Sequence, residues 1–284
     1  MIRIGTCSWK YDSWKGIIFP EKEKFNHLEE YSKHFNTVEI DQWFWSLFDS
    51  KKPALPKKSD IELYTNSVPE DFKFTIKIPN SITLTHYYNK NKSTPLKPNQ
   101  YFLDQDLFES FQESLTPMSN KIGVLMFQFE YLNKQKISGL TEFIDRFESF
   151  ISSINKKYGY GIEIRNPNFL KKPFFDFVER NNLAMVFLQG YYMPPVWQTF
   201  SEFKDQIKFS VVIRLHGPDR SGIEEKTGGI WNKIIEPKDE EIDKISEIIY
   251  YFQKKKIDAY INVNNHYEGS APLTIKKIRE KIKI

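Results

Sequence analysis

Acidic, basic and imidazole side chains recur towards the ends of short apolar segments, and their types suit acid–base chemistry. Two carboxylates that face one pocket can act as general acid and general base when their surroundings separate their pKa values, as in glycoside hydrolysis. We therefore name Glu39 and Glu163 as candidate catalytic residues, with His216 as their proton-transfer partner. The alternative is a buried ion-pair network in which Lys77 and Arg214 neutralise the two glutamates.

Further polar residues in comparable positions would bind and orient a ligand. Arg214 offers a rigid fork for a carboxylate or phosphate, whereas Lys77 offers a point charge. Aromatic residues such as Trp9 and Tyr192 lie in the loops and could stack on a sugar ring or a base, although many of them must pack the loops together. The candidate substrate-binding residues are Ser8, Trp9, Lys77, His86, Gln128, Arg165, Arg214, Asn262, Asn264 and Asn265.

Metal and thiol chemistry are weaker readings of the sequence. His86, His216 and His266 could join the glutamates around a metal, but no close spacing such as His-Glu-x-x-His occurs. We predict no cofactor and no metal ligands, with a divalent metal as the open alternative. Cys7 is the sole cysteine, which excludes an intrachain disulfide and a four-cysteine zinc site. A lone cysteine in a strand is more often a small buried apolar residue than a nucleophile.

Short β-branched or aromatic segments alternate with longer amphipathic ones along the whole chain. Eight strand–helix pairs favour a parallel sheet closed into one (β/α)8 barrel of the TIM type over residues 1–284, with an open doubly wound sheet as the alternative. Long loops follow strands 1, 3 and 7, at residues 10–25, 79–101 and 217–237. The predicted strands are 2–8, 37–41, 72–78, 123–129, 160–165, 184–188, 210–216 and 259–264. The predicted helices are 26–34, 59–66, 103–115, 140–152, 173–181, 196–205, 238–255 and 272–283.

Alternation within the strands predicts which side chains point into the barrel. Val38 and Ile40 share one face of the second strand, which leaves Glu39 and Asp41 on the other. The third, fifth, seventh and eighth strands repeat this pattern, with apolar residues outward and polar residues inward. The inward charges come near the carboxyl ends of the strands, where barrels of this type carry their active sites. The sequence therefore predicts a polar pocket at that end, rimmed by aromatic residues.

Composition narrows the protein class. Hydrophobic residues make up 40% of the 284 residues and aromatic residues 16%, which is enough for one large core. We find no long apolar run and no signal-like start, so we expect a cytoplasmic protein without a membrane partner. The net charge of +4 is spread along the chain, whereas nucleic-acid-binding proteins concentrate theirs on one face. We therefore expect a small polar or anionic ligand, with nucleic acid as a less favoured partner and the oligomeric state open.

Several motifs together resemble the YecE-like family, a domain of unknown function. Gly5-Thr6-Cys7-Ser8-Trp9 opens the chain and is followed by Trp14-Lys15-Gly16. The other segments that carry the resemblance are 35–40, 72–79, Thr85-His86, 125–129, 161–166, 214–217 and 263–271. The resemblance implies a TIM-type barrel and brings no reaction with it.

The residues and the resemblance together lead to one functional hypothesis. We expect an enzyme, a hydrolase or an isomerase, that acts on a sugar- or phosphate-bearing small molecule by carboxylate acid–base chemistry. The alternative is a ligand- or nucleic-acid-binding module without turnover.

Overall fold

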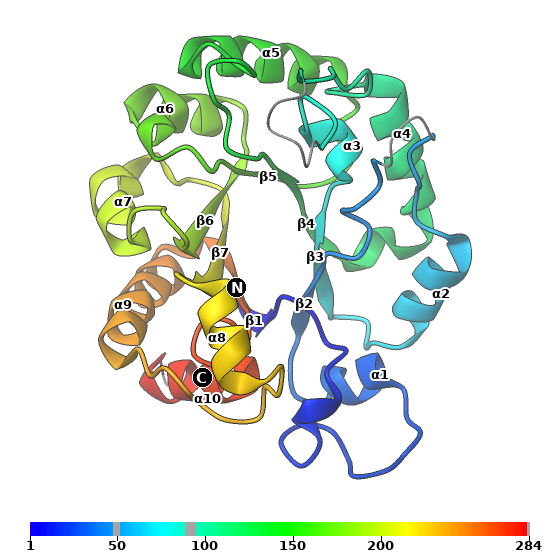
Figure 1. Ribbon diagram of the computed structural model, residues 1–284, viewed down its shortest axis with the longest axis vertical. Helices are drawn as coiled ribbons and strands as arrows, with labels where there is room; N and C mark the ends of the chain where they lie inside the picture. The colour runs from blue at the N-terminus through cyan, green and yellow to red at the C-terminus, as the bar shows by residue number, and fades with distance from the viewer. Residues whose placement is uncertain (48–51, 89–94, 283–284) are drawn as a thin grey trace.

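Eight parallel strands form a closed barrel in chain order in the computed structural model, which describes residues 1–47, 52–88 and 95–282. Figure 1 looks down this barrel, with the strands in the middle and the helices around them. The predicted (β/α)8 architecture is thus confirmed. The strands are β1 (Ile2–Thr6), β2 (Thr37–Ile40), β3 (Lys73–Lys77), β4 (Ile122–Gln128), β5 (Tyr160–Glu163), β6 (Ala184–Gly190), β7 (Ser210–Gly217) and β8 (Asp258–Val263).

The outer helices match the predicted ones closely, except that Lys283, the last residue of the final predicted helix, lies outside the described residues. Two helices were not predicted, α3 and α8, and both lie in segments that the sequence analysis assigned to loops. Helix α3 is a single turn, and α8 presents only Ile223 and Thr227 to the interior, so neither has an apolar stripe. The helices are α1 (His27–Ser32), α2 (Lys58–Asn66), α3 (Asn80–Thr83), α4 (Gln105–Ser114), α5 (Leu140–Ser153), α6 (Lys172–Arg180), α7 (Val196–Phe203), α8 (Arg220–Thr227), α9 (Asp239–Lys255) and α10 (Ala271–Ile282).

Two separate apolar cores account for the alternation along the strands. The larger core lies between the strands and the helices and contains the outward residues, for example Val38, Ile76 and Ile213. The smaller core fills the inside of the barrel, and its buried residues are Val124, Met126, Ala184, Val186, Val212 and Tyr260. The inward polar residues follow this inner core towards the carboxyl ends of the strands, as the alternation predicts.

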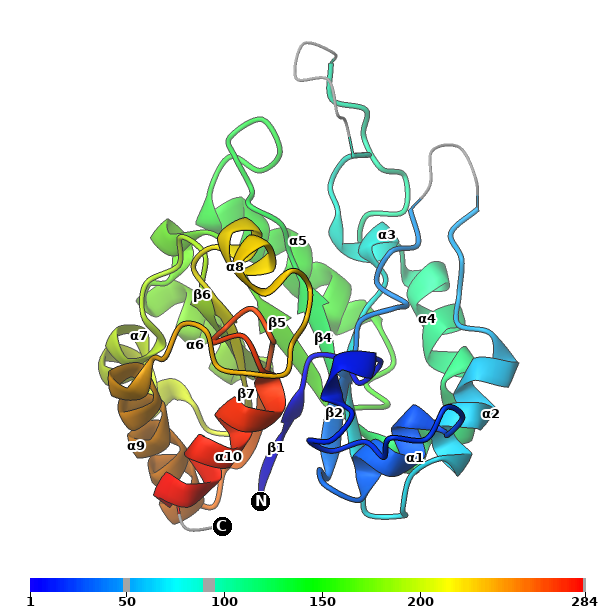
Figure 2. The ribbon, with the colours of Figure 1, turned by 60° about the horizontal axis from the view of Figure 1, so that its bottom comes forward.

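The carboxyl ends of the strands lie at the end of the barrel opposite the N-terminus. Figure 2 shows α3 and α8 at this end of the barrel. Helix α8 begins after Asp219, whose side chain accepts a hydrogen bond from the Gly222 amide and so caps the helix. Among the described helices, none combines the length and apolar character that crossing a bilayer requires.

Candidate functional site

Arg214 on β7 ties together the two glutamates of the barrel interior. Its Nε and Nη2 donate to the two carboxylate oxygens of Glu39 at 2.7 and 2.8 Å. Its Nη1 donates to Glu163 Oε2 and, at 3.2 Å, to Gln128 Oε1. All three charged side chains are about 1% exposed or less. Glu39, Glu163 and Arg214 thus form a buried ion-pair network, the arrangement that the sequence analysis left open as the alternative to catalysis.

Burial and pairing together set the charge states of this network. Burial alone would raise the pKa of Glu163, but the guanidinium groups of Arg214 and Arg165 outweigh it and lower that pKa to about 2. Burial likewise works against the charge of Arg214, and the two glutamates overcome it, so the pKa of Arg214 is raised well above its usual value. Glu163 is thus a carboxylate, without the raised pKa that a general acid requires.

Asn262 on β8 closes the network on the side of β2 and β3. Its Nδ2 donates to Glu39 Oε2 at 3.1 Å and to the Thr75 hydroxyl at 2.9 Å. Its Oδ1 is buried and has no hydrogen-bond partner among the described residues. Glu39 therefore has both oxygens engaged by neighbouring donors, which fixes its orientation.

A thiol and an imidazole lie beside the network, at the ends of β1 and β7. The Sγ atom of Cys7 is 3.6 Å from His216 Nε2, and His216 Nδ1 is 3.4 Å from the Tyr191 hydroxyl. Burial raises the pKa of the Cys7 thiol well above its usual value. Burial, together with the positive charge of Arg214, holds the pKa of His216 well below its usual value. The pair is therefore a neutral thiol and a neutral imidazole.

Two cations at the strand ends retain unused hydrogen-bond donors. Arg165 follows β5, and its Nε donates to Glu163 Oε1 at 2.9 Å, while its two terminal nitrogens have no acceptor in the described chain. The guanidinium lies 5.3 Å from the centre of the Tyr191 ring, and a quarter of the side chain is exposed. Lys77 ends β3, makes no hydrogen bond or ion pair with the described residues, and lies with Nζ 4.7 Å from the centre of the Phe44 ring. Burial and the nearby Arg214 lower the pKa of Lys77.

Two exposed tyrosines, Tyr131 and Tyr192, lie beside the charged residues at the strand ends. Only Tyr192 was among the aromatic residues that the sequence analysis considered. Tyr131 and Tyr192 come from the loops after β4 and β6, and their rings meet edge to face at 6.1 Å. Both are at least half exposed, which is unusual for large aromatic side chains. Arg165 and Glu163 both influence the pKa of Tyr192, so the pair lies beside the charged network. Tyr192 was among the predicted loop aromatics, whereas the sequence carries no signal for its pairing with Tyr131.

The other predicted ligand-binding residues take different places. Ser8 and Asn264 are partly exposed near the strand ends, and Asn264 Oδ1 accepts a hydrogen bond from the His266 amide. Trp9 is buried in the outer core and packs edge to face on Tyr64 of α2. His86 follows β3 and contacts the Thr85 hydroxyl at 2.9 Å.

Asn265 has a local structural role, because its Oδ1 accepts a hydrogen bond from the Ala271 amide at the start of α10. In the described ranges, no group of three or more histidine, cysteine, aspartate or glutamate side chains is arranged to hold a metal ion.

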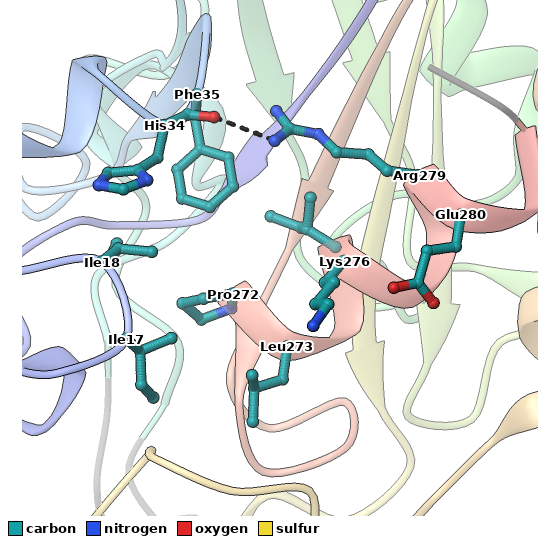
Figure 3. Close-up of a pocket in the computed structure, with 10 residues that line it drawn as sticks. Ile17, Ile18, His34, Phe35, Pro272, Leu273, Lys276, Arg279 and Glu280 are labelled. Carbon is teal, nitrogen blue, oxygen red and sulfur yellow. Dashed lines mark hydrogen bonds between the residues drawn. The ribbon is translucent and has the colours of Figure 1, made fainter.

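A separate cavity of about 430 Å³ lies on the outer side of the barrel, between α10 and the segments on either side of α1. Figure 3 shows it lined by Ile17, Ile18, Pro272 and Leu273, with Arg279 donating to the backbone carbonyl of His34 at 3.0 Å. None of the predicted site residues lines it.

Comparison with known proteins assigns a family and no reaction. The family model described as "Protein of unknown function DUF72" matches residues 3–284. The UPF0759 protein YunF of Bacillus subtilis is 23% identical over all of this chain and 95% of its own length. The UPF0759 protein YecE of Escherichia coli K12 is 25% identical over 61% of this chain. The match covers about half, 51%, of the length of YecE.

Solved structures from the same family share the fold. A DUF72 family protein from Enterococcus faecalis aligns with all of this chain and 96% of its own, with a TM-score of 0.68 and 18% identity. A DUF72 family protein from Thermotoga maritima aligns over the full length of both chains, with a TM-score of 0.67 and 16% identity. At these sequence identities the structural similarity supports the barrel fold and no specific function.

Proposed function

This chain belongs to the DUF72 family of proteins of unknown function, and we propose that its barrel mouth is the active site of an enzyme, a hydrolase or an isomerase, that acts on a small sugar phosphate or similar organic anion. The observation that carries the proposal is Arg165. Its side chain is held by Glu163 and Tyr191, and its two terminal nitrogens have no acceptor in the described chain. A guanidinium with two free donors is suited to bidentate binding of phosphate or carboxylate.

The surroundings of Arg165 supply the other parts of such a site. His216 is a neutral imidazole, which can accept a proton from a bound molecule near neutral pH. Tyr131 and Tyr192 offer exposed ring faces beside Arg165, and these suit the apolar face of a sugar. In this proposal the carboxylates of Glu39 and Glu163 hold Arg214 and Arg165 in place, and His216 replaces them as the group that moves the proton.

The test combines ligand binding with hydrogen exchange. We expect glyceraldehyde 3-phosphate to bind the purified protein in calorimetry, and Arg165→Gln to weaken that binding about tenfold or more, since a charge-assisted hydrogen-bond pair is lost. Arg180→Gln is the matched control, because Arg180 also stacks on an aromatic ring but pairs with Glu148 on the outer surface. Equal affinity of the wild type and Arg165→Gln would overturn the anion site.

The proton-transfer role has its own readout. In deuterium oxide, an isomerase exchanges the hydrogen next to the carbonyl group of the bound sugar phosphate for deuterium, which nuclear magnetic resonance detects. We expect His216→Gln to retain binding and to lose most of this exchange. Undiminished exchange in His216→Gln would remove His216 from the mechanism.

A further inference from the structure

Lys77 differs from the buried Lys121 in what surrounds its amine. Lys121 is 4% exposed, and its Nζ donates to the backbone carbonyls of Val68 and Pro69 at 2.8 Å each. Lys77 is partly exposed, and its Nζ has no acceptor among the described residues and faces the ring of Phe44. The ammonium group of Lys121 thus has hydrogen-bond acceptors, whereas the amine of Lys77 has none among the described residues.

The pKa of the Lys77 amine is lowered from its usual value. Burial disfavours its ammonium form, and Arg214 adds like-charge repulsion, so the pKa of Lys77 is lowered despite Glu39, Asp41 and Glu163 nearby. A lysine next to a second cation in a site with little water is the arrangement that activates an amine as a nucleophile.

Asp41 supplies a candidate proton donor on the neighbouring strand. Ile40 of β2 pairs with Ile76 of β3, so Asp41 and Lys77 are the next residues along adjacent strands. Burial raises the pKa of the Asp41 carboxyl, although a hydrogen bond from its own backbone amide works in the opposite direction. Asp41 is close enough to influence the pKa of Lys77, yet the two side chains form no ion pair within 4 Å.

We propose that Lys77 forms an imine with the carbonyl carbon of a small anionic aldehyde or ketone, with Asp41 as the acid that assists the loss of water. The proposal rests on the proposed function, because Arg165 would hold the anionic group of the same molecule. It narrows the substrate class from an organic anion to an anion that carries a reactive carbonyl group.

The step balances without an oxidant or a reductant. The lone pair of the unprotonated Nζ attacks the carbonyl carbon, the π bond of the C=O group breaks, and one of the two Nζ protons moves to the former carbonyl oxygen to give a neutral carbinolamine. Asp41 then donates its proton to the hydroxyl group, which leaves as water while the nitrogen lone pair forms the C=N bond. The nitrogen keeps its second proton, so the product is an iminium ion beside the Asp41 carboxylate.

Reductive trapping tests this directly on the full chain. The protein is incubated at pH 7 with sodium cyanoborohydride and either glyceraldehyde 3-phosphate or glyceraldehyde, and peptides are quantified by mass spectrometry. With the phosphate compound we expect Lys77 to be modified at least about tenfold faster than the exposed Lys57, because a lowered pKa leaves more free amine. Lys121 should remain unmodified. Modification of Lys77 no faster than that of Lys57 would overturn the proposal.

Three variants separate this proposal from the one on which it rests. We expect Asp41→Asn to slow the trapping of Lys77, and Lys77→Met to remove the fast adduct while binding of inorganic phosphate persists. We expect Arg165→Gln to slow trapping by the phosphate compound to the rate of neutral glyceraldehyde. Fast trapping that is indifferent to Arg165→Gln would refute the anion site and leave the imine standing. Binding that depends on Arg165 without any fast adduct would refute the imine and leave the proposed function standing.

Discussion

Replacing Arg214 by methionine is predicted to destabilise the barrel strongly, because it leaves two buried carboxylates without their shared cation. The pKa of Glu163 falls from 4.5 to about 2 in the folded protein, which corresponds to about 3 kcal/mol of stabilisation near neutral pH. Removing one partner of a buried ion pair costs about 3–5 kcal/mol in comparable cases. We therefore expect Arg214→Met to lower the free energy of unfolding by about 3–5 kcal/mol at pH 7.

The pH dependence gives this prediction a sign. In the wild type the folded pKa of Glu163 is depressed, so its stabilising contribution is present above about pH 4.5 and is lost as the pH falls towards 2. In Arg214→Met the buried Glu163 carboxyl loses its main cation, so protonation relieves an unfavourable charge instead. The difference in stability between wild type and variant should therefore shrink as the pH falls from 7 to 4.

Urea unfolding between pH 4 and 7, followed by circular dichroism, measures this difference. Arg180→Met is the matched control, because its ion pair with Glu148 is 47% and 33% exposed and should be worth less than about 1 kcal/mol. The triple variant Arg214→Met, Glu39→Gln, Glu163→Gln should recover much of the lost stability, since the three buried charges of the network are removed together. A loss below about 1 kcal/mol for Arg214→Met, or a loss that does not vary with pH, would refute the reasoning.

Two further predictions follow from the strand ends. Cys7 should resist iodoacetamide at pH 8 in the native protein and react readily in urea, because its thiol is buried with a raised pKa; rapid native alkylation, measured by mass spectrometry, would contradict this. Gly5→Ala should destabilise the protein by several kcal/mol in thermal or urea unfolding, because a Cβ there would lie 1.9 Å from the Thr37 carbonyl oxygen. Gly139→Ala is the matched control, because a Cβ at Gly139 would meet no atom within 4 Å. Equal stability of the two variants would argue against this packing.

The alternation of apolar and polar residues was sufficient to predict which strand residues point into the barrel, because successive side chains of a strand lie on opposite faces of the sheet. That constraint is enough to place Glu39, Arg214 and Asn262 inside the barrel from the sequence alone. The constraint does not extend to Trp9 and Asn265, because both lie beyond the strand ends, where alternation no longer applies. Trp9 turns to the outer core, and Asn265 caps α10.

Ion pairs between side chains on distant strands could not be predicted from the sequence. Whether Glu39 and Glu163 act separately or share one cation depends on where β2, β5 and β7 meet across the barrel, which no local pattern encodes. The same holds for Lys77, because its lack of a hydrogen-bond partner among the described residues can be recognised only when the neighbours of its amine are known. Helix α8 escaped prediction for a different reason, since it is capped by Asp219 and lies on the surface without an apolar stripe.

The buried ion-pair network is connected to the two neighbouring cations, Arg165 and Lys77. Glu163 gives one oxygen to Arg214 and the other to Nε of Arg165, so the buried pair fixes the side of Arg165 that faces the barrel. The terminal nitrogens of Arg165 have no acceptor among the described residues, and burial together with the positive charge of Arg214 lowers the pKa of both Lys77 and His216. In the proposed site Arg214 would therefore act without touching the ligand, by orienting Arg165 and by helping to lower the pKa of Lys77 and of His216.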